Sequence, residues 1–151
     1  ERPYLKSSLT TFWNSWHITL AQWFRAYFFN PLTRAMRSRG RYYPVWLVVL
    51  IGQLSTMLLI GLWHGITLNF AAWGLWHGAG LFIHNRWSDA TRARFAGLVA
   101  RPQIQRSPLV FRAVSAAGTL ITFHYVVLGW VRFALPSMDL SWKVFLKLMG
   151  F

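Results

Sequence analysis

Long uncharged runs alternate with short basic clusters along this chain of 151 residues. No Asp, Glu, Lys or Arg occurs over residues 42–83, a stretch that would be about 63 Å long as one helix. The hydrocarbon core of a bilayer is about 30 Å thick, so a run of this length has to turn back on itself. The glycines at 61 and 65 favour a turn over Gly61–Thr67. The pattern therefore predicts membrane-spanning helices at 44–60 and 67–83.

A third apolar run, residues 109–135, predicts a third span, because the two arginines near its ends can reach the membrane surface. The basic residues gather before the first span and between the second and third, at Arg34, Arg37, Arg39, Arg41, Arg86, Arg92, Arg94, Arg101 and Arg106. An outward and a return span place both clusters on one side of the membrane. The positive-inside rule predicts that this side, including a basic loop at 85–108, is cytoplasmic.

The segment 8–30 has the rhythm of an amphipathic helix that ends at Pro31. Its apolar stripe consists of Trp13, Trp16, Leu20, Trp23, Phe24, Tyr27 and Phe28. His17 lies inside this stripe, whereas Asn14, Ser15, Gln22 and Arg25 lie on the other side. A helix so rich in tryptophan is expected at the membrane interface or as a re-entrant element. A short amphipathic helix is expected at 139–149.

Composition supports a membrane protein. The chain is 55% hydrophobic and 13% charged, against about a quarter charged residues in ordinary soluble domains. Its net charge of +13 could suit a nucleic-acid-binding protein or a solvated basic tail. Nucleic-acid-binding proteins spread their basic residues over a face of a soluble fold, whereas here they cluster between uncharged runs. A solvated basic tail would not contain so much tryptophan and phenylalanine. A polytopic membrane protein is therefore favoured. No cysteine is present, which excludes a disulfide framework and a thiolate nucleophile on this chain.

Histidines are the candidate functional groups. His64 lies between two glycines in an apolar run, and an ionisable side chain at membrane depth is a functional-site hypothesis by default. His77, beside Gly74 and Gly78, is expected to serve helix packing, although it sits in the same tripeptide, Trp-His-Gly. His84 is expected at the cytoplasmic membrane edge and the role of His124 stays open. Haem ligation needs a facing pair of histidines, which no spacing specifies here, so no metal or tightly bound cofactor is expected.

Two blocks resemble the membrane-bound O-acyltransferases (MBOAT). They are "SLTTFWNSWHITLAQWFRAYFFNPL" at 8–32 and "IGLWHGITLNFAAWGLWHGAGLFI" at 60–83. Their order and separation are similar to the bacterial branch, whose members acetylate alginate or peptidoglycan or D-alanylate lipoteichoic acid. The last residues are similar to the alginate-type members. The resemblance implies an all-α, multi-helix membrane bundle, of which residues 1–151 would be the C-terminal part. The chain also lacks an initiator methionine and runs straight into the first block, which likewise indicates a longer protein upstream.

The resemblance also implies the site residues. His64 matches the near-invariant family histidine, and His17 matches the second active-site position. The expected substrate channel consists of Trp13, Trp16, Asn14, Trp63 and Asn69. Bacterial relatives often carry basic residues where this chain has Asn14 and Ser15, so contact with a donor phosphate is not implied there.

The implied reaction moves an acyl group, expected to be acetyl, from acetyl-CoA or an acyl-carrier thioester to a polysaccharide or cell-wall polymer outside the cytoplasm. A neutral imidazole is a suitable general base at pH 7 for deprotonating the hydroxyl, and His64 is expected to take that role. The chain contains no Ser-His-Asp or Cys-His arrangement, because its three acids lie in expected loops. Direct transfer, or transfer through a partner's nucleophile, is therefore expected.

The expected partners are the lipid bilayer of the bacterial cytoplasmic membrane, the rest of the protein and an extracytoplasmic acceptor protein, and no nucleic acid. Two other functions stay open. One is a transporter with His17, His64 and His124 as a proton relay, although transporters usually also place a carboxylate at depth. The other is a non-catalytic membrane scaffold that keeps the motif.

Overall fold

The computed structural model describes residues 2–38, 43–99 and 107–150, and every regular element in that part is helical. The all-α fold class is therefore confirmed. The α-helices are α1 (Leu9–Trp13), α2 (Ile18–Phe24), α3 (Asn30–Ser38), α4 (Val45–His64), α5 (Leu68–Val99), α7 (Pro108–Ala134) and α8 (Met138–Leu148). A 3₁₀ turn at Pro3–Leu5 precedes α1, and a π-helical turn at Arg25–Phe29 joins α2 to α3.

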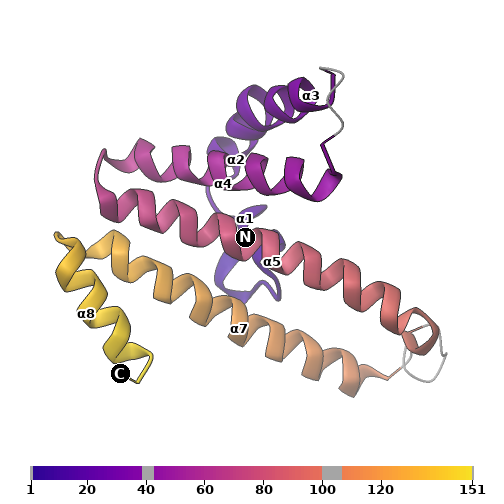
Figure 1. Ribbon diagram of the computed structural model, residues 1–151. Helices are drawn as coiled ribbons and strands as arrows, with labels where there is room; N and C mark the ends of the chain where they lie inside the picture. The colour runs from indigo at the N-terminus through magenta and orange to yellow at the C-terminus, as the bar shows by residue number, and fades with distance from the viewer. Residues whose placement is uncertain (1, 39–42, 100–106, 151) are drawn as a thin grey trace.

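Three long helices form the body of the structure. Figure 1 shows α4 and α5 as an antiparallel hairpin, with α7 running antiparallel beside α5. Glycines let the hairpin close tightly: a side chain at Gly61 would meet the backbone of Phe70, and one at Gly74 would meet the backbone of Met57. The N-terminal helices cross this layer, with α1 against α5 and α3 against α4, and α8 packs on the end of α7.

The turn between α4 and α5 is shorter than expected. The helix continues through Gly61 to His64, and residues 65–67 alone make the connection. Gly61 is used for close helix packing instead of for a turn. His64 is consequently the last residue of a long helix, and its backbone position is held by that helix.

The expected basic loop at 85–108 is helical in its first half, since α5 runs on to Val99, and residues 100–106 lie outside the described part of the chain. Arginines do not end a helix when water can reach them, and Arg86 pairs with Asp89 one turn later. The uncharged part of α5, from Leu68 to Asn85, is about 27 Å long, close to the hydrocarbon thickness.

Two of the described helices, α4 and α7, are long and apolar enough to cross a membrane. Only 28% and 17% of their apolar windows are buried within the structure, whereas a core helix of a soluble protein would be mostly buried. Large side chains such as Leu109, Phe111 and Ile121 are exposed on α7. The expected span at 67–83 lies within α5, which does not meet the same criterion, so three spans stay a prediction.

The segment 8–30 is not one continuous helix. Ser8 caps α1 by accepting a hydrogen bond from the Thr11 backbone N–H at 3.2 Å, but α1 ends at Trp13 and α2 begins only at Ile18. Pro31 does not end the helical segment either, because it is the second residue of α3. Helical residues continue from Ile18 through the π-helical turn into α3, so Pro31 lies inside the helical run, directly after that turn.

Candidate active site

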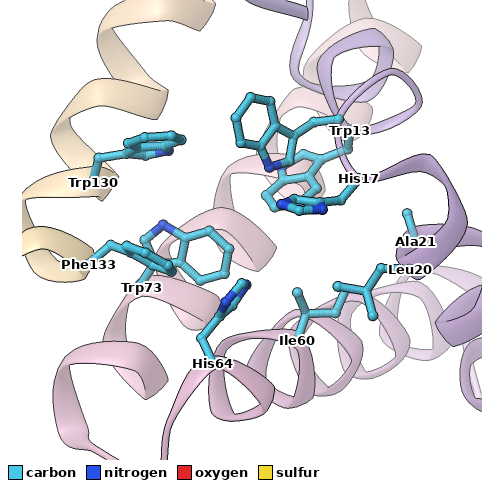
Figure 2. A pocket seen from close by; sticks show the side chains of 10 residues that line it. Trp13, His17, Leu20, Ala21, Ile60, His64, Trp73, Trp130 and Phe133 are labelled. Atoms are coloured by element: carbon cyan, nitrogen blue, oxygen red, sulfur yellow. The ribbon is translucent and has the colours of Figure 1, made fainter.

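A cavity of about 160 Å³ opens between the N-terminal helices and the three long helices. Its lining residues are Trp13, Trp16, His17, Leu20, Ala21, Ile60, His64, Trp73, Trp130 and Phe133. We call this the histidine cavity. Figure 2 shows the imidazoles of His17 and His64 facing its open centre from two different walls. Residues from five helical segments thus converge on one aromatic chamber with two titratable groups.

His17 owes its position to an unusual backbone. It lies in the break between α1 and α2 with φ 44° and ψ 48°, and it is the one non-glycine residue with a positive φ among the described residues. A left-handed conformation of this kind costs about 1–3 kcal/mol and often marks a functional site. The conformation turns the chain so that His17 packs edge-on against Trp16, with ring centroids 5.3 Å apart.

His64 sits at the C-terminal end of α4 and is half-buried. Its ring meets Phe133 edge-on at a centroid distance of 4.9 Å and Trp73 at 5.7 Å, so helices α5 and α7 hold its outer faces. The centroids of His17 and His64 are 6.4 Å apart, with the ring planes inclined by 62°. A small reacting group between them could reach both imidazoles.

A second, more polar cavity of about 270 Å³ adjoins the histidine cavity and shares Trp13, Ala21 and Ile60 with it. Its other lining residues are Thr10, Asn14, Arg25, Phe29, Gln53, Thr56, Met57, Leu81 and Asn85. We call this the polar cavity. Within it, an Arg25 guanidinium N–H donates a hydrogen bond to Oδ1 of Asn14 at 3.1 Å. A positive charge therefore lies beside Asn14, although residue 14 itself is neutral.

A third, shallower hollow lies beyond His17 and Leu20, which it shares with the histidine cavity. Its other lining residues are Ile18, Thr19, Trp23, Phe24 and Trp63. We call this the tryptophan hollow. The three spaces follow one another along α4: Gln53 lines the polar cavity, Ile60 and His64 line the histidine cavity, and Trp63 lines the hollow.

The predicted channel residues are distributed over these spaces. Trp13 and Trp16 line the histidine cavity, Asn14 lines the polar cavity and Trp63 lines the tryptophan hollow. Asn69 lines none of the three. It is buried, and its Nδ2 donates a hydrogen bond to the carbonyl oxygen of Leu135 at 2.8 Å. Asn69 thus ties the start of α5 to the end of α7.

Sequence reasoning missed the far wall, made by Trp73 of α5 and by Trp130 and Phe133 of α7. The pair on α7 is three residues apart and so shares a helix face. That signal is weak, because α7 is apolar around most of its circumference and offers no contrasting polar face.

The other histidines have different surroundings. His77 is fully buried beside Trp13 and Trp73. Nδ1 of His84 lies 3.2 Å from the hydroxyl of Thr10. Nδ1 of His124 lies 2.7 Å from the carbonyl oxygen of Leu120 in its own helix. Neither of these two lines the histidine cavity.

Comparison with models of protein families finds none that matches the chain. Among individual proteins, the probable alginate O-acetylase AlgI of Pseudomonas aeruginosa is 33% identical over 151 residues, all of this chain and 24% of the relative. The peptidoglycan O-acetyltransferase of Helicobacter pylori is 31% identical over 148 residues, 98% of this chain and 24% of the relative. The teichoic acid D-alanyltransferase of Streptococcus thermophilus is 28% identical over 139 residues, 89% of this chain and 32% of the relative. The chain thus spans about a quarter to a third of the length of these relatives.

Proposed function

We propose that this chain, which belongs to the membrane-bound O-acyltransferase family as its two motif blocks predicted, contributes the catalytic histidines of a cell-envelope O-acyltransferase. The complete enzyme would move an acyl group, expected to be acetyl, from a thioester to a hydroxyl of an extracytoplasmic polysaccharide or cell-wall polymer. One observation carries the proposal: His17 and His64, from the two separate blocks, face each other across the same aromatic cavity.

The proposed chemistry uses His64 as the general base. Its neutral imidazole takes the proton of the acceptor hydroxyl while the hydroxyl oxygen attacks the thioester carbonyl. The tetrahedral intermediate then collapses with cleavage of the carbon–sulfur bond, and the leaving thiolate takes the proton from the imidazolium. His17 faces the same space and would donate a hydrogen bond to the carbonyl oxygen as negative charge develops on it. The hydroxyl belongs either to the polymer or to a partner protein that passes the acyl group on.

The donor, acetyl-CoA or an acyl-carrier thioester, would approach through the polar cavity. Amide and hydroxyl side chains such as Gln53, Thr56 and Asn85 suit the amide-rich arm of such thioesters. Arg25 offers a positive charge to an anionic group of the donor, although positions 14 and 15 are neutral in this chain. The acceptor would enter from the opposite side, through the tryptophan hollow.

The distribution of arginines supports an approach of the donor from the cytoplasm and of the acceptor from the opposite side. Because α4 and α5 are antiparallel, the start of α4 and the end of α5 lie at the same end of the bundle (Figure 1). Arg34 and Arg37 of α3 precede the start of α4, and Arg92 and Arg94 lie toward the end of α5. We propose that this end faces the cytoplasm and that the complete protein is a multi-pass protein of the bacterial cytoplasmic membrane. Cysteines placed at Ser38 and Ser88 should both react with thiol reagents applied from the cytoplasm, and labelling from opposite sides would contradict this orientation.

The bilayer, the rest of the protein and an extracytoplasmic acceptor protein are the proposed partners, and nucleic acid is not among them. Exposed apolar side chains along α7 need lipid or other helices to cover them. We therefore expect residues 1–151 expressed alone to lack acyltransferase activity. Turnover by this segment in liposomes would contradict that expectation.

The deciding experiment uses the complete enzyme, with its acceptor protein, in liposomes. Transfer of a labelled acyl group from thioester to polymer is compared between the wild type, His64→Ala and His124→Ala. The last is a matched control, because His124 is exposed and lies outside the histidine cavity. Folded His64→Ala should transfer at least about 100-fold more slowly, and His124→Ala at the wild-type rate. Equal transfer by folded His64→Ala would refute its role as base, and proton transport without acyl transfer would favour the transporter.

A further inference from the structure

The histidine cavity and the polar cavity meet at a partition. Trp13, Ala21 and Ile60 are the residues that line both, so any group that passes from one space to the other passes these three side chains. Figure 2 shows Ala21 and Ile60 together at one side of the histidine cavity, across from Trp130 and Phe133. If the donor arm occupies the polar cavity, its acyl end has to extend past this partition to reach the imidazoles.

The partition is held at a set distance from the histidines by helical geometry. The backbone N–H of Ala21 donates to the carbonyl oxygen of His17 at 2.9 Å, so Ala21 lies one turn after His17. Ile60 lies one turn before His64 on the same face of α4. Ile60 is 4% exposed and belongs to the hydrophobic core, which leaves it little freedom to move aside.

The room beyond the partition is small. A cavity of about 150 Å³ in an apolar protein core takes up a single benzene molecule. The histidine cavity, at about 160 Å³, must hold the acyl group together with the acceptor hydroxyl. Its far wall consists of large rings, Trp73, Trp130 and Phe133, which cannot retract without disrupting their tilted ring–ring contacts. An acyl group of a few atoms fits there and a long chain does not.

The cavity also discriminates by charge. Among the described residues that line it, none is acidic, and the described acids, Asp89 and Asp139, instead pair with Arg86 and Lys143. An aminoacyl group would bring an ammonium into this apolar space without a carboxylate to pair with it. Burying an unpaired charge is strongly unfavourable. The walls therefore disfavour a group such as alanyl even though its size is acceptable.

We infer that Ala21 and Ile60 are specificity-determining residues that restrict the reaction to short acyl groups, and that the apolar lining beyond them favours uncharged ones. The inference rests on the proposed function and names the class of donor that this site accepts. Size is limited by the partition and the aromatic far wall, whereas charge is limited by the lack of an acid in the lining.

Competing thioesters test both limits in the complete enzyme. The donors are acetyl, isobutyryl, hexanoyl and alanyl thioesters of the same carrier, and kcat/KM is measured for transfer to polymer. Isobutyryl and alanyl have the same shape, with a methyl group in place of the ammonium. The wild type should favour acetyl over hexanoyl by at least about 100-fold, since one methylene alone is worth about tenfold or more. It should favour isobutyryl over alanyl by at least about tenfold, because the alanyl ammonium would be buried without a partner.

The variants separate the two limits. Ile60→Ala should narrow the preference for acetyl over hexanoyl at least about tenfold and leave the preference for isobutyryl over alanyl unchanged. Ala21→Val should widen the preference for acetyl. Ile51→Ala is the matched control, because Ile51 lies on the same helix but lines none of the three spaces, and it should leave all ratios unchanged. Ile60→Val, which removes one methyl group, replaces Ile60→Ala if the latter does not fold.

The outcomes distinguish the inference from the proposed function. Acetyl transfer with wild-type ratios in both Ile60 variants and in Ala21→Val would overturn the inference alone, as would a wild type that uses hexanoyl as well as acetyl. Absence of transfer from every thioester would overturn the proposed function and the inference with it.

Discussion

The tripeptide Trp-His-Gly occurs twice, at 63–65 and 76–78, and the two copies lie in opposite environments. In the first, Trp63 is 62% exposed and His64 faces a cavity at the end of α4. In the second, Trp76 stacks on Tyr125 at a centroid distance of 4.6 Å, and His77 is 1% exposed in the middle of α5. The same three residues thus border a cavity in one place and form a helix-packing contact in the other.

The difference comes from the residues that follow each copy and from what packs against it. Gly65 ends α4 with an extended backbone, which leaves His64 without a further helical turn above it. Gly78 is followed by more helix and lies against Leu54 of α4, where a larger side chain would crowd the hairpin. On the other face of α5, Gly129 of α7 leaves the space that the His77 ring occupies. The surroundings of each Trp-His-Gly copy therefore depend on whether it lies at the end of its helix or within it.

The largest effect is expected at the first copy. His64→Gln should lower the acyl-transfer rate of the complete, folded enzyme by about 10²- to 10⁴-fold, because a lost general base typically costs that much. His17→Gln should lose activity to a smaller extent. If both imidazoles serve one transition state, the double variant should be scarcely slower than His64→Gln alone. Single-turnover rates of the three variants measure this coupling, and losses that multiply would show that the histidines act independently.

The tryptophan of the second copy should contribute much more to the free energy of unfolding than the tryptophan of the first. The indole of Trp76 donates a hydrogen bond to the carbonyl oxygen of Tyr125 at 3.1 Å and lies beneath the Arg132 guanidinium, so Trp76→Ala should lower the free energy of unfolding by about 3–5 kcal/mol. Trp63→Ala should change it by no more than about 0.5 kcal/mol, because the ring is exposed. Denaturant titrations of the complete protein in micelles compare the two. Equal destabilisation would contradict the division between the copies.

Much of the helical framework could be predicted from the sequence, because apolar runs of membrane length leave the backbone few alternatives to a helix. The end of α5 at Val99 could not be predicted, because arginines are compatible both with a helix that continues out of the membrane and with a loop. The left-handed turn at His17 could not be predicted either, because the aromatic residues on both sides of it have the spacing of one continuous helix.

The candidate site divides in the same way. The two histidines were predicted from motifs, which are local in the chain. Trp130 and Phe133 were not, because they reach the cavity through the packing of α7 against α5, and α7 has no contrasting polar face to indicate which side is buried. Asn69 carried no signal that separates a channel residue from one that ties two helices together.

The smallest effect is expected at His77. The sequence predicted a role in helix packing, and neither ring nitrogen of His77 has a hydrogen-bond partner among the described residues. His77→Gln should then cost only the repacking around Trp13, Trp73 and Gly129, about 0.5–1.5 kcal/mol in the free energy of unfolding, with acyl transfer per folded molecule nearly unchanged.

His77→Leu decides whether that reason is right. An apolar side chain replaces an unpaired polar ring there, so this variant should be at least as stable as His77→Gln. Both variants are measured in the complete protein by the same micelle titrations, with transfer rates normalised to folded protein. A leucine variant less stable than the glutamine one would reveal a polar partner for His77. A folded His77→Gln as inactive as His64→Gln would mean that the second copy is catalytic as well, and that a fully buried histidine behind Trp13 and Trp73 reaches the reaction through the cavity wall.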